Sequence, residues 1–170
     1  PHKKETAISR TDRLNMLNLA IEGEEKMSVS DYEITKDTVS YSADTTEYFK
    51  SLYPDDELFF IMGADSFINV EKWYKGEELL AEFGFIVSSR PGYPEKELES
   101  KMKFYRMDYD TKIIRLMTKM PDISSTEIRE TALAGESIRH LVPAVVEKYI
   151  QMNGLYDDML KNPRWKMDSY

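Results

Sequence analysis

The stretch Leu58-Phe59-Phe60-Ile61-Met62-Gly63 decides the fold class of this chain. A short, continuous apolar run that ends in glycine is typical of a strand buried on both faces, as in a parallel sheet. A second run of this kind covers Phe83 to Val87, and a short amphipathic helix is expected between the two, from Glu77 to Phe83. Strands that alternate with helices predict an α/β fold with a doubly wound parallel sheet, in which ligands bind at the carboxyl ends of the strands.

Further elements follow on either side of these two strands. The pattern predicts one further strand region over 113–117 and the stretch up to Ile123. It also predicts a strand over 27–34, where apolar and polar residues alternate with one slip. Thr11-Asp12 is expected to cap one helix and Asp44-Thr45-Thr46 to open another, which continues through Leu52. Two last helices are expected over 125–134 and 143–152. Residues 93–112, charged and rich in tyrosine, are interpreted as a surface excursion, and residues 1–170 as a single domain.

Composition limits the classes of function. The 170 residues are 41% hydrophobic and carry a formal net charge of −8, which indicates a globular protein and argues against general nucleic-acid binding. No apolar run approaches the roughly 20 residues that span a bilayer, so no membrane partner is expected. The absence of cysteine excludes disulfides and thiolate metal sites, and it suits a reducing cytoplasm.

A cluster of hydroxyls and one cation lies at the expected start of the helix over 125–134. The run Asp122-Ile123-Ser124-Ser125-Thr126-Glu127-Ile128-Arg129 places them after a strand region. The first N–H groups of a helix lack intrahelical partners, and the helix dipole is positive there, so such an end can hold phosphate. Arg129, one turn in, can reach back as a fork-shaped cation. The alternative is a simple capping box between Ser124 and Glu127.

Several motifs in a fixed order extend this picture along nearly the whole chain. They are Pro1-His2-Lys3-Lys4, Ser40-Tyr41-Ser42-Ala43-Asp44-Thr45, Gly63-Ala64-Asp65-Ser66, Lys72-Trp73-Tyr74, Arg90-Pro91-Gly92, Ile123 to Arg129, Leu141-Val142-Pro143 and Asn153-Gly154-Leu155-Tyr156. With these motifs the chain resembles the bacterial nicotinate mononucleotide adenylyltransferases. The resemblance implies adenylyl transfer from ATP to nicotinate mononucleotide in NAD biosynthesis, with Mg²⁺ held mainly by the ATP phosphates and water. No residue of the chain is assigned as a metal ligand.

The resemblance also implies roles for individual residues. Those expected at ATP are Gly63, Asp65, Arg90, Ser124, Ser125, Thr126 and Arg129, and those expected at the mononucleotide are His2, Lys3, Ser42, Trp73 and Tyr74. Trp73 would stack on the pyridine ring, and backbone amides near Ser42 and Tyr74 would bind the nicotinate carboxylate. Each role has a structural alternative: Asp65 as a helix cap, Trp73 as core, and Arg90 as the partner of a carboxylate of the fold.

One departure from the family concerns the catalytic residues. The family has a Gly-rich loop with His-x-Gly-His after its first strand, whereas the only histidines here are His2 and His140. We therefore assign no catalytic residue and expect the sequence to be a fragment that lacks a first βαβ unit of about 30 or more residues. Two alternatives stay open: an adenylyltransferase of the pantetheine-phosphate type, and an inert nucleotide-binding fragment. The sequence does not decide the oligomeric state, and a homo-oligomer stays open.

Overall fold

The computed structural model describes residues 8–36, 38–89, 93–117, 121 and 123–156. The chain divides into two compact units. The sheet unit comprises Thr38–Asp122, and the helical unit comprises Pro1–Asp37 together with Ile123–Tyr170. Among the described residues, no helix is long and apolar enough to cross a membrane.

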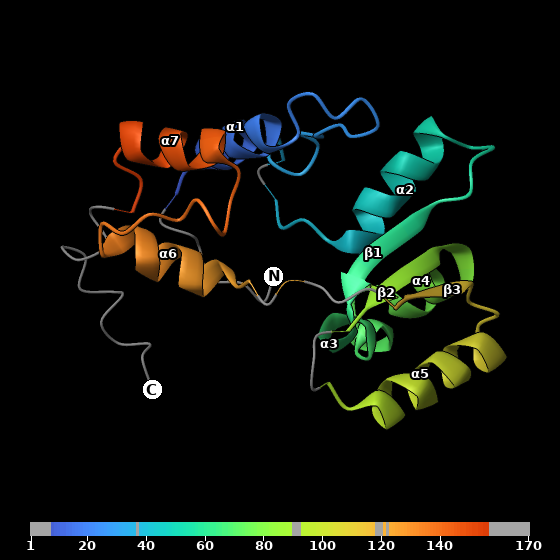
Figure 1. Ribbon diagram of the computed structural model, residues 1–170. Coiled ribbons are helices and arrows are strands. Elements are labelled where there is room, and N and C mark those ends of the chain that lie inside the picture. The colour runs from blue at the N-terminus through green and yellow to red at the C-terminus, as the bar shows by residue number, and fades with distance from the viewer. Residues whose placement is uncertain (1–7, 37, 90–92, 118–120, 122, 157–170) are drawn as a thin grey trace. The chain divides into compact units, whose positions relative to one another are not determined.

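The sheet unit is a parallel α/β structure (Figure 1). Its three strands lie in sequence order β1-β2-β3, with Phe60 opposite Phe85 and Ile86 opposite Ile114. Both strand pairs are parallel, so the α/β class with a parallel sheet, predicted from the apolar runs, is confirmed. The elements are α2 (Ser42–Leu52), β1 (Phe59–Gly63), α3 (Ala64–Phe67), the 3₁₀ helix η1 (Val70–Lys72), α4 (Gly76–Glu82), β2 (Gly84–Ser88), α5 (Glu95–Asp108) and β3 (Ile113–Leu116).

The core of this unit lies on one face of the sheet. Phe85 and Val87 of β2 are fully buried there, whereas Ile61 of β1 is 69% exposed and Ile114 of β3 is 44% exposed. The expectation that the strand over 58–62 is buried on both faces is therefore wrong for Ile61. The strand order explains the difference, because right-handed crossovers between strands that follow one another in the sheet place their helices on the same face.

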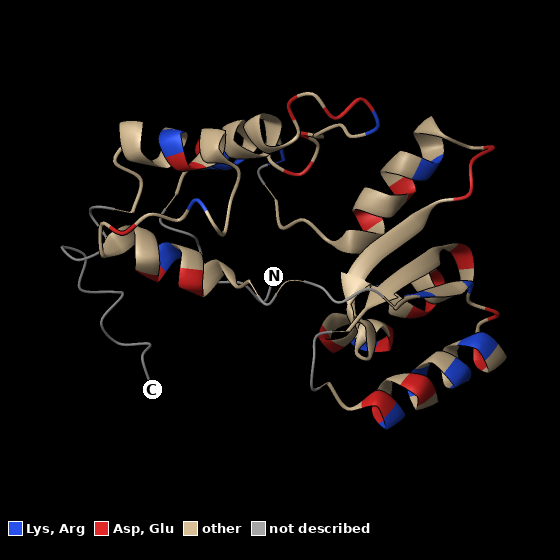
Figure 2. Ribbon diagram, viewed as in Figure 1, with Lys and Arg blue, Asp and Glu red and all other residues tan. Residues whose placement is uncertain are grey.

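Residues 93–112 do not form the expected surface excursion. They contain α5, a helix of 14 residues whose Leu98, Met102 and Tyr105 are buried in the core of the sheet unit. These three positions recur at helical spacing, so they form one apolar stripe. Charged residues of both signs cover the rest of the helix (Figure 2), and they dominate its composition enough to hide the stripe.

The helical unit consists of α1 (Arg10–Ala20), α6 (Ser125–Leu133) and α7 (Ala144–Met152). Its core is formed by Ile138, Val146 and Ile150. Helices α1 and α7 are joined by Tyr149, whose hydroxyl donates to Asp12 Oδ1 at 2.9 Å. The helices predicted over 125–134 and 143–152 are confirmed to within a residue.

Two other sequence expectations differ from the structure. The helix expected to be capped by Thr11-Asp12 is capped instead by Ser9, whose Oγ accepts from the Asp12 amide at 3.0 Å. Residues 27–31 have no regular secondary structure and residues 32–34 form a turn in place of the expected strand; the Ile34 amide donates to the Asp31 carbonyl at 3.0 Å. Local turn bonds thus replace the ladder bonds that a strand needs from a neighbour.

Candidate functional site

The start of α6 has the geometry that its sequence predicts. Ser124 is the N-cap, with extended backbone angles, and its Oγ accepts a hydrogen bond from the Glu127 amide at 3.0 Å. Ser125 and Thr126 follow in the first turn, and both are exposed. The capping bond of Ser124 is therefore present, while the hydroxyls of the next two residues lie at the end of the helix where unpaired amides and the dipole favour an anion.

Arg129 reaches back toward this helix start. Its Nη2 donates to Thr126 Oγ1 at 3.1 Å, across one turn of α6. The charge of Arg129 also acts on Tyr156. Burial raises the pKa of Tyr156, and the nearby Arg129 guanidinium opposes that rise. The helical unit thus places a half-buried cation and two hydroxyls on one short surface at the N-terminus of α6.

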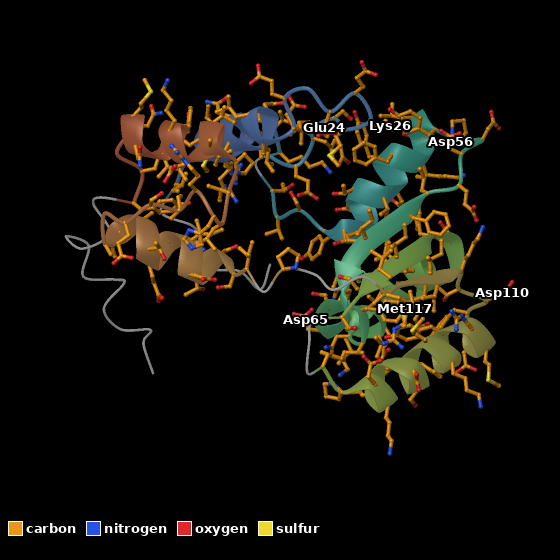
Figure 3. The ribbon with its side chains drawn as sticks, in the orientation of Figure 1. Glu24, Lys26, Asp56, Asp65, Asp110 and Met117 are labelled. Atoms are coloured by element: carbon orange, nitrogen blue, oxygen red, sulfur yellow. The ribbon has the colours of Figure 1, made fainter. Side chains whose placement is uncertain are left out.

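Gly63 and Asp65 stand together at the carboxyl end of β1 (Figure 3). A Cβ added to Gly63 would lie 2.6 Å from Asp65 Oδ1, so the carboxylate covers the glycine Cα. Gly63, and not Asp65, is the N-cap of α3. The capping alternative for Asp65 therefore finds no support, and its exposed carboxylate stays available for a ligand at the strand end.

Trp73 lies directly after η1 and is half-buried. Its ring meets the ring of Phe60 edge-on, with centroids 6.3 Å apart, and it packs against the core of the sheet unit. Gly76 makes the tight turn that follows, since a Cβ there would lie 2.0 Å from the Val70 carbonyl oxygen. Trp73 consequently has both a core contact and some solvent access. Its geometry is compatible with stacking on a pyridine ring and with a role in the core.

Tyr74 lies beside Tyr41, the residue that precedes Ser42 at the start of α2. The Tyr74 ring is 52% exposed and lies 4.6 Å, centroid to centroid, from the ring of Tyr41, which is the N-cap of α2. Ser42 is the first residue of that helix. Lys75 strengthens the contact, because its Nζ lies 2.9 Å from Glu47 Oε1 of α2. The segment that carries Trp73 and Tyr74 therefore lies beside the N-terminus of an eleven-residue helix.

Some predicted site residues lie outside the described part of the chain. These are His2, Lys3 and Arg90. His140 is described and exposed. Among the described residues, no group of three or more histidine, aspartate or glutamate side chains is placed to hold a metal ion.

The sequence did not point to a polar cluster behind Trp73. Glu71 of η1 accepts hydrogen bonds from Lys101 and Tyr105 of α5. Glu71 lies 30 positions before Lys101 and 34 before Tyr105, and no short motif links it to them. The helical spacing of Leu98, Met102 and Tyr105 is a signal in the sequence for a helix with one buried face, but it does not name η1 as a neighbour.

Comparison with known proteins identifies the family. The cytidylyltransferase-like family model matches residues 1–131. A probable nicotinate-nucleotide adenylyltransferase of Carboxydothermus hydrogenoformans is 40% identical over 158 residues, which are 92% of this chain and 78% of the relative. The chain belongs to the nicotinate-nucleotide adenylyltransferase family. A second member, from Clostridium tetani, is 37% identical over 157 residues, with coverage of 92% and 78%.

Solved structures share the fold of this family member. A Plasmodium falciparum nicotinic acid mononucleotide adenylyltransferase complexed with APC matches with a TM-score of 0.69 and 22% identity, over 89% of this chain and 78% of that one. The same enzyme complexed with NaAD matches with a TM-score of 0.67 and 20% identity, over 92% and 78%. The family resemblance and the nucleotidyltransferase fold expected from the sequence motifs are thus confirmed.

Proposed function

We propose that this protein transfers the adenylyl group of ATP to nicotinate mononucleotide, which gives nicotinate adenine dinucleotide and pyrophosphate. The relatives that share 33–40% of their residues with it carry the nicotinate-nucleotide adenylyltransferase name, and this supports the pyridine substrate over the pantetheine-phosphate alternative. The observation that carries the proposal in the structure is the start of α6, where Arg129 reaches back to Thr126 beside the Ser124 cap. We place the reaction in the cytoplasm.

The reaction needs positioning and charge neutralisation more than covalent chemistry. A phosphate oxygen of the mononucleotide forms a bond to the α-phosphorus of ATP, while the bond from that phosphorus to the oxygen of the pyrophosphate breaks. Negative charge develops on the leaving pyrophosphate. Donors that are fixed before the reaction, such as the first-turn amides of α6, the Ser125 hydroxyl and the Arg129 guanidinium, stabilise that charge without rearranging.

Mg²⁺ is proposed to bind together with ATP, on the ATP phosphates. Mg²⁺ in nucleotide sites keeps several waters and uses substrate phosphates with one or two carboxylates at most. When bound, the ion neutralises phosphate charge. Asp65, exposed in α3 directly after β1, is proposed to accept hydrogen bonds from the ribose hydroxyls of the nucleotide.

The mononucleotide is proposed to bind beside Trp73, Tyr74 and Ser42, where the segment that carries the two aromatic residues lies next to the N-terminus of α2. A flat pyridine ring suits the exposed part of an aromatic face. The N-terminus of α2 offers first-turn amides and a positive dipole end, and a carboxylate accepts hydrogen bonds there better than a neutral carboxamide does. The contact between Tyr74 and Tyr41 supports a shared subsite for Ser42 and Tyr74. His2 and Lys3 stay proposed as residues that bind the mononucleotide, and Arg90 as one that binds ATP; all three lie outside the described residues.

A comparison of three adenylyl acceptors, each supplied separately, tests the proposal. The purified protein is incubated with ATP and Mg²⁺ and with nicotinate mononucleotide, nicotinamide mononucleotide or phosphopantetheine, and the products are separated by chromatography. We expect a dinucleotide from nicotinate mononucleotide at the highest rate. Preferential adenylylation of phosphopantetheine would overturn the proposal.

A further inference from the structure

Glu71 connects the segment that carries Trp73 to the helix α5. The residue lies in the middle of η1, two positions before Trp73. Lys101 Nζ donates to Glu71 Oε1, and the Tyr105 hydroxyl donates to Glu71 Oε2. Both carboxylate oxygens are therefore occupied by donors from one face of α5.

This cluster constrains the chain more than an exposed ion pair would. Tyr105 is fully buried, its ring edge lies against Phe67 at 5.1 Å between centroids, and the Glu71 side chain is only 20% exposed. By contrast, the Lys112–Glu57 pair of the same unit is 59% and 58% exposed. Exposed pairs hold geometry weakly, whereas a carboxylate with two donors, one from a buried side chain, has few alternative positions.

The remainder of η1 leaves Trp73 little freedom to move independently. Val70 is fully buried in the core, and its carbonyl accepts from the Trp73 amide at 2.9 Å. Gly76 packs against the same carbonyl. A displacement of η1 therefore moves Trp73 and the turn behind it together, and the Glu71 cluster is the link that fixes η1 to α5.

We propose that Glu71, held by Lys101 and Tyr105, is a positioning residue for nicotinate mononucleotide. It fixes the position and orientation of the Trp73 ring, on which the pyridine ring stacks. The inference rests on the proposed function, because it takes Trp73 as the surface on which the pyridine ring stacks. It assigns to α5 a part in the binding of the mononucleotide, which Lys101 and Tyr105 exert through Glu71 of η1.

Variants of the two donors test this inference. Tyr105→Phe and Lys101→Met each remove one hydrogen bond to Glu71 and keep the bulk of the side chain, while Lys101→Arg retains a donor. We expect the KM for nicotinate mononucleotide to rise about tenfold in the first two and to recover largely in the third, as expected for loss of a charge-assisted positioning bond. The KM for ATP should stay unchanged. Glu57→Gln, which breaks the exposed pair of the same unit, is the matched control.

A double-variant cycle separates positioning from a general loss of stability. If Tyr105 acts through Trp73, Tyr105→Phe has no further effect on mononucleotide binding in a Trp73→Ala background. In a Trp165→Phe background, where Trp73 is the single tryptophan, Tyr105→Phe should also reduce the fluorescence quenching that the mononucleotide causes. Equal loss of affinity for ATP and mononucleotide, or full additivity with Trp73→Ala, would overturn the inference. If the unaltered protein bound no nicotinate mononucleotide, the proposed function itself would fail.

Discussion

Replacing Arg129 with alanine removes the cation from the N-terminus of α6. The half-buried guanidinium donates one described hydrogen bond, to the hydroxyl of the exposed Thr126, so its loss should change the free energy of unfolding by less than about 0.5 kcal/mol. A hydrogen bond between the guanidinium and a phosphate oxygen is worth about 1.5–3 kcal/mol. At about 1.4 kcal/mol for each factor of ten, kcat/KM for ATP should fall roughly tenfold to hundredfold.

The assay measures initial rates of pyrophosphate release with ATP and mononucleotide varied in turn. Arg129→Lys keeps the charge but loses the fork, so it should lie between the alanine variant and the unaltered protein. Arg13→Ala removes an exposed arginine from α1 of the same unit and serves as the control. The reasoning would be refuted if Arg129→Ala left kcat/KM for ATP within twofold, or if its loss matched a comparable loss of folded protein in urea titration.

Three further predictions concern other parts of the chain. Trp73→Ala should raise the KM for the mononucleotide much more than that for ATP in steady-state kinetics, because only the pyridine ring loses its stacking partner; equal effects would reject the stacking role. Leu98→Ala should lower the free energy of unfolding in urea by about 2–5 kcal/mol, since Leu98 is fully buried, and a small effect would mean that α5 packs less tightly than described. The Ser137 hydroxyl, the Ile138 amide and the Arg139 guanidinium hold the pKa of Glu147 below its ordinary value of 4.5. Their contribution to stability is complete above that value and is lost as the pH falls through the lower folded pKa, so Glu147→Gln should flatten the acid limb of a stability profile, and an unchanged limb would contradict this.

Local signals account for the parts of the fold that the sequence predicted. The apolar runs identified β1 and β2 because strands of a parallel sheet are continuously hydrophobic. Ser124 identified the start of α6 because a hydroxyl three residues before Glu127 satisfies one of its free amides. These features depend on a few adjacent residues, so they can be found without knowledge of the neighbours.

The features that escaped prediction depend on partners distant in the chain. Helix α5 looked like a solvated segment because its charges outnumber the three residues that it buries. The alternation over 27–34 resembled a strand, but an alternating pattern forms a strand only where another strand supplies the ladder bonds. The bonds from Lys101 and Tyr105 to Glu71 join two elements that become neighbours only through the crossover between β2 and β3.

The fate of each ATP phosphorus tests the central claim most directly. The protein is incubated with nicotinate mononucleotide, Mg²⁺ and ATP labelled either at the α- or at the γ-phosphorus. Adenylyl transfer predicts that the α label appears in nicotinate adenine dinucleotide and the γ label in pyrophosphate, in equal amounts. Recovery of the γ label as orthophosphate, or of the α label in ADP with no dinucleotide formed, would contradict the account.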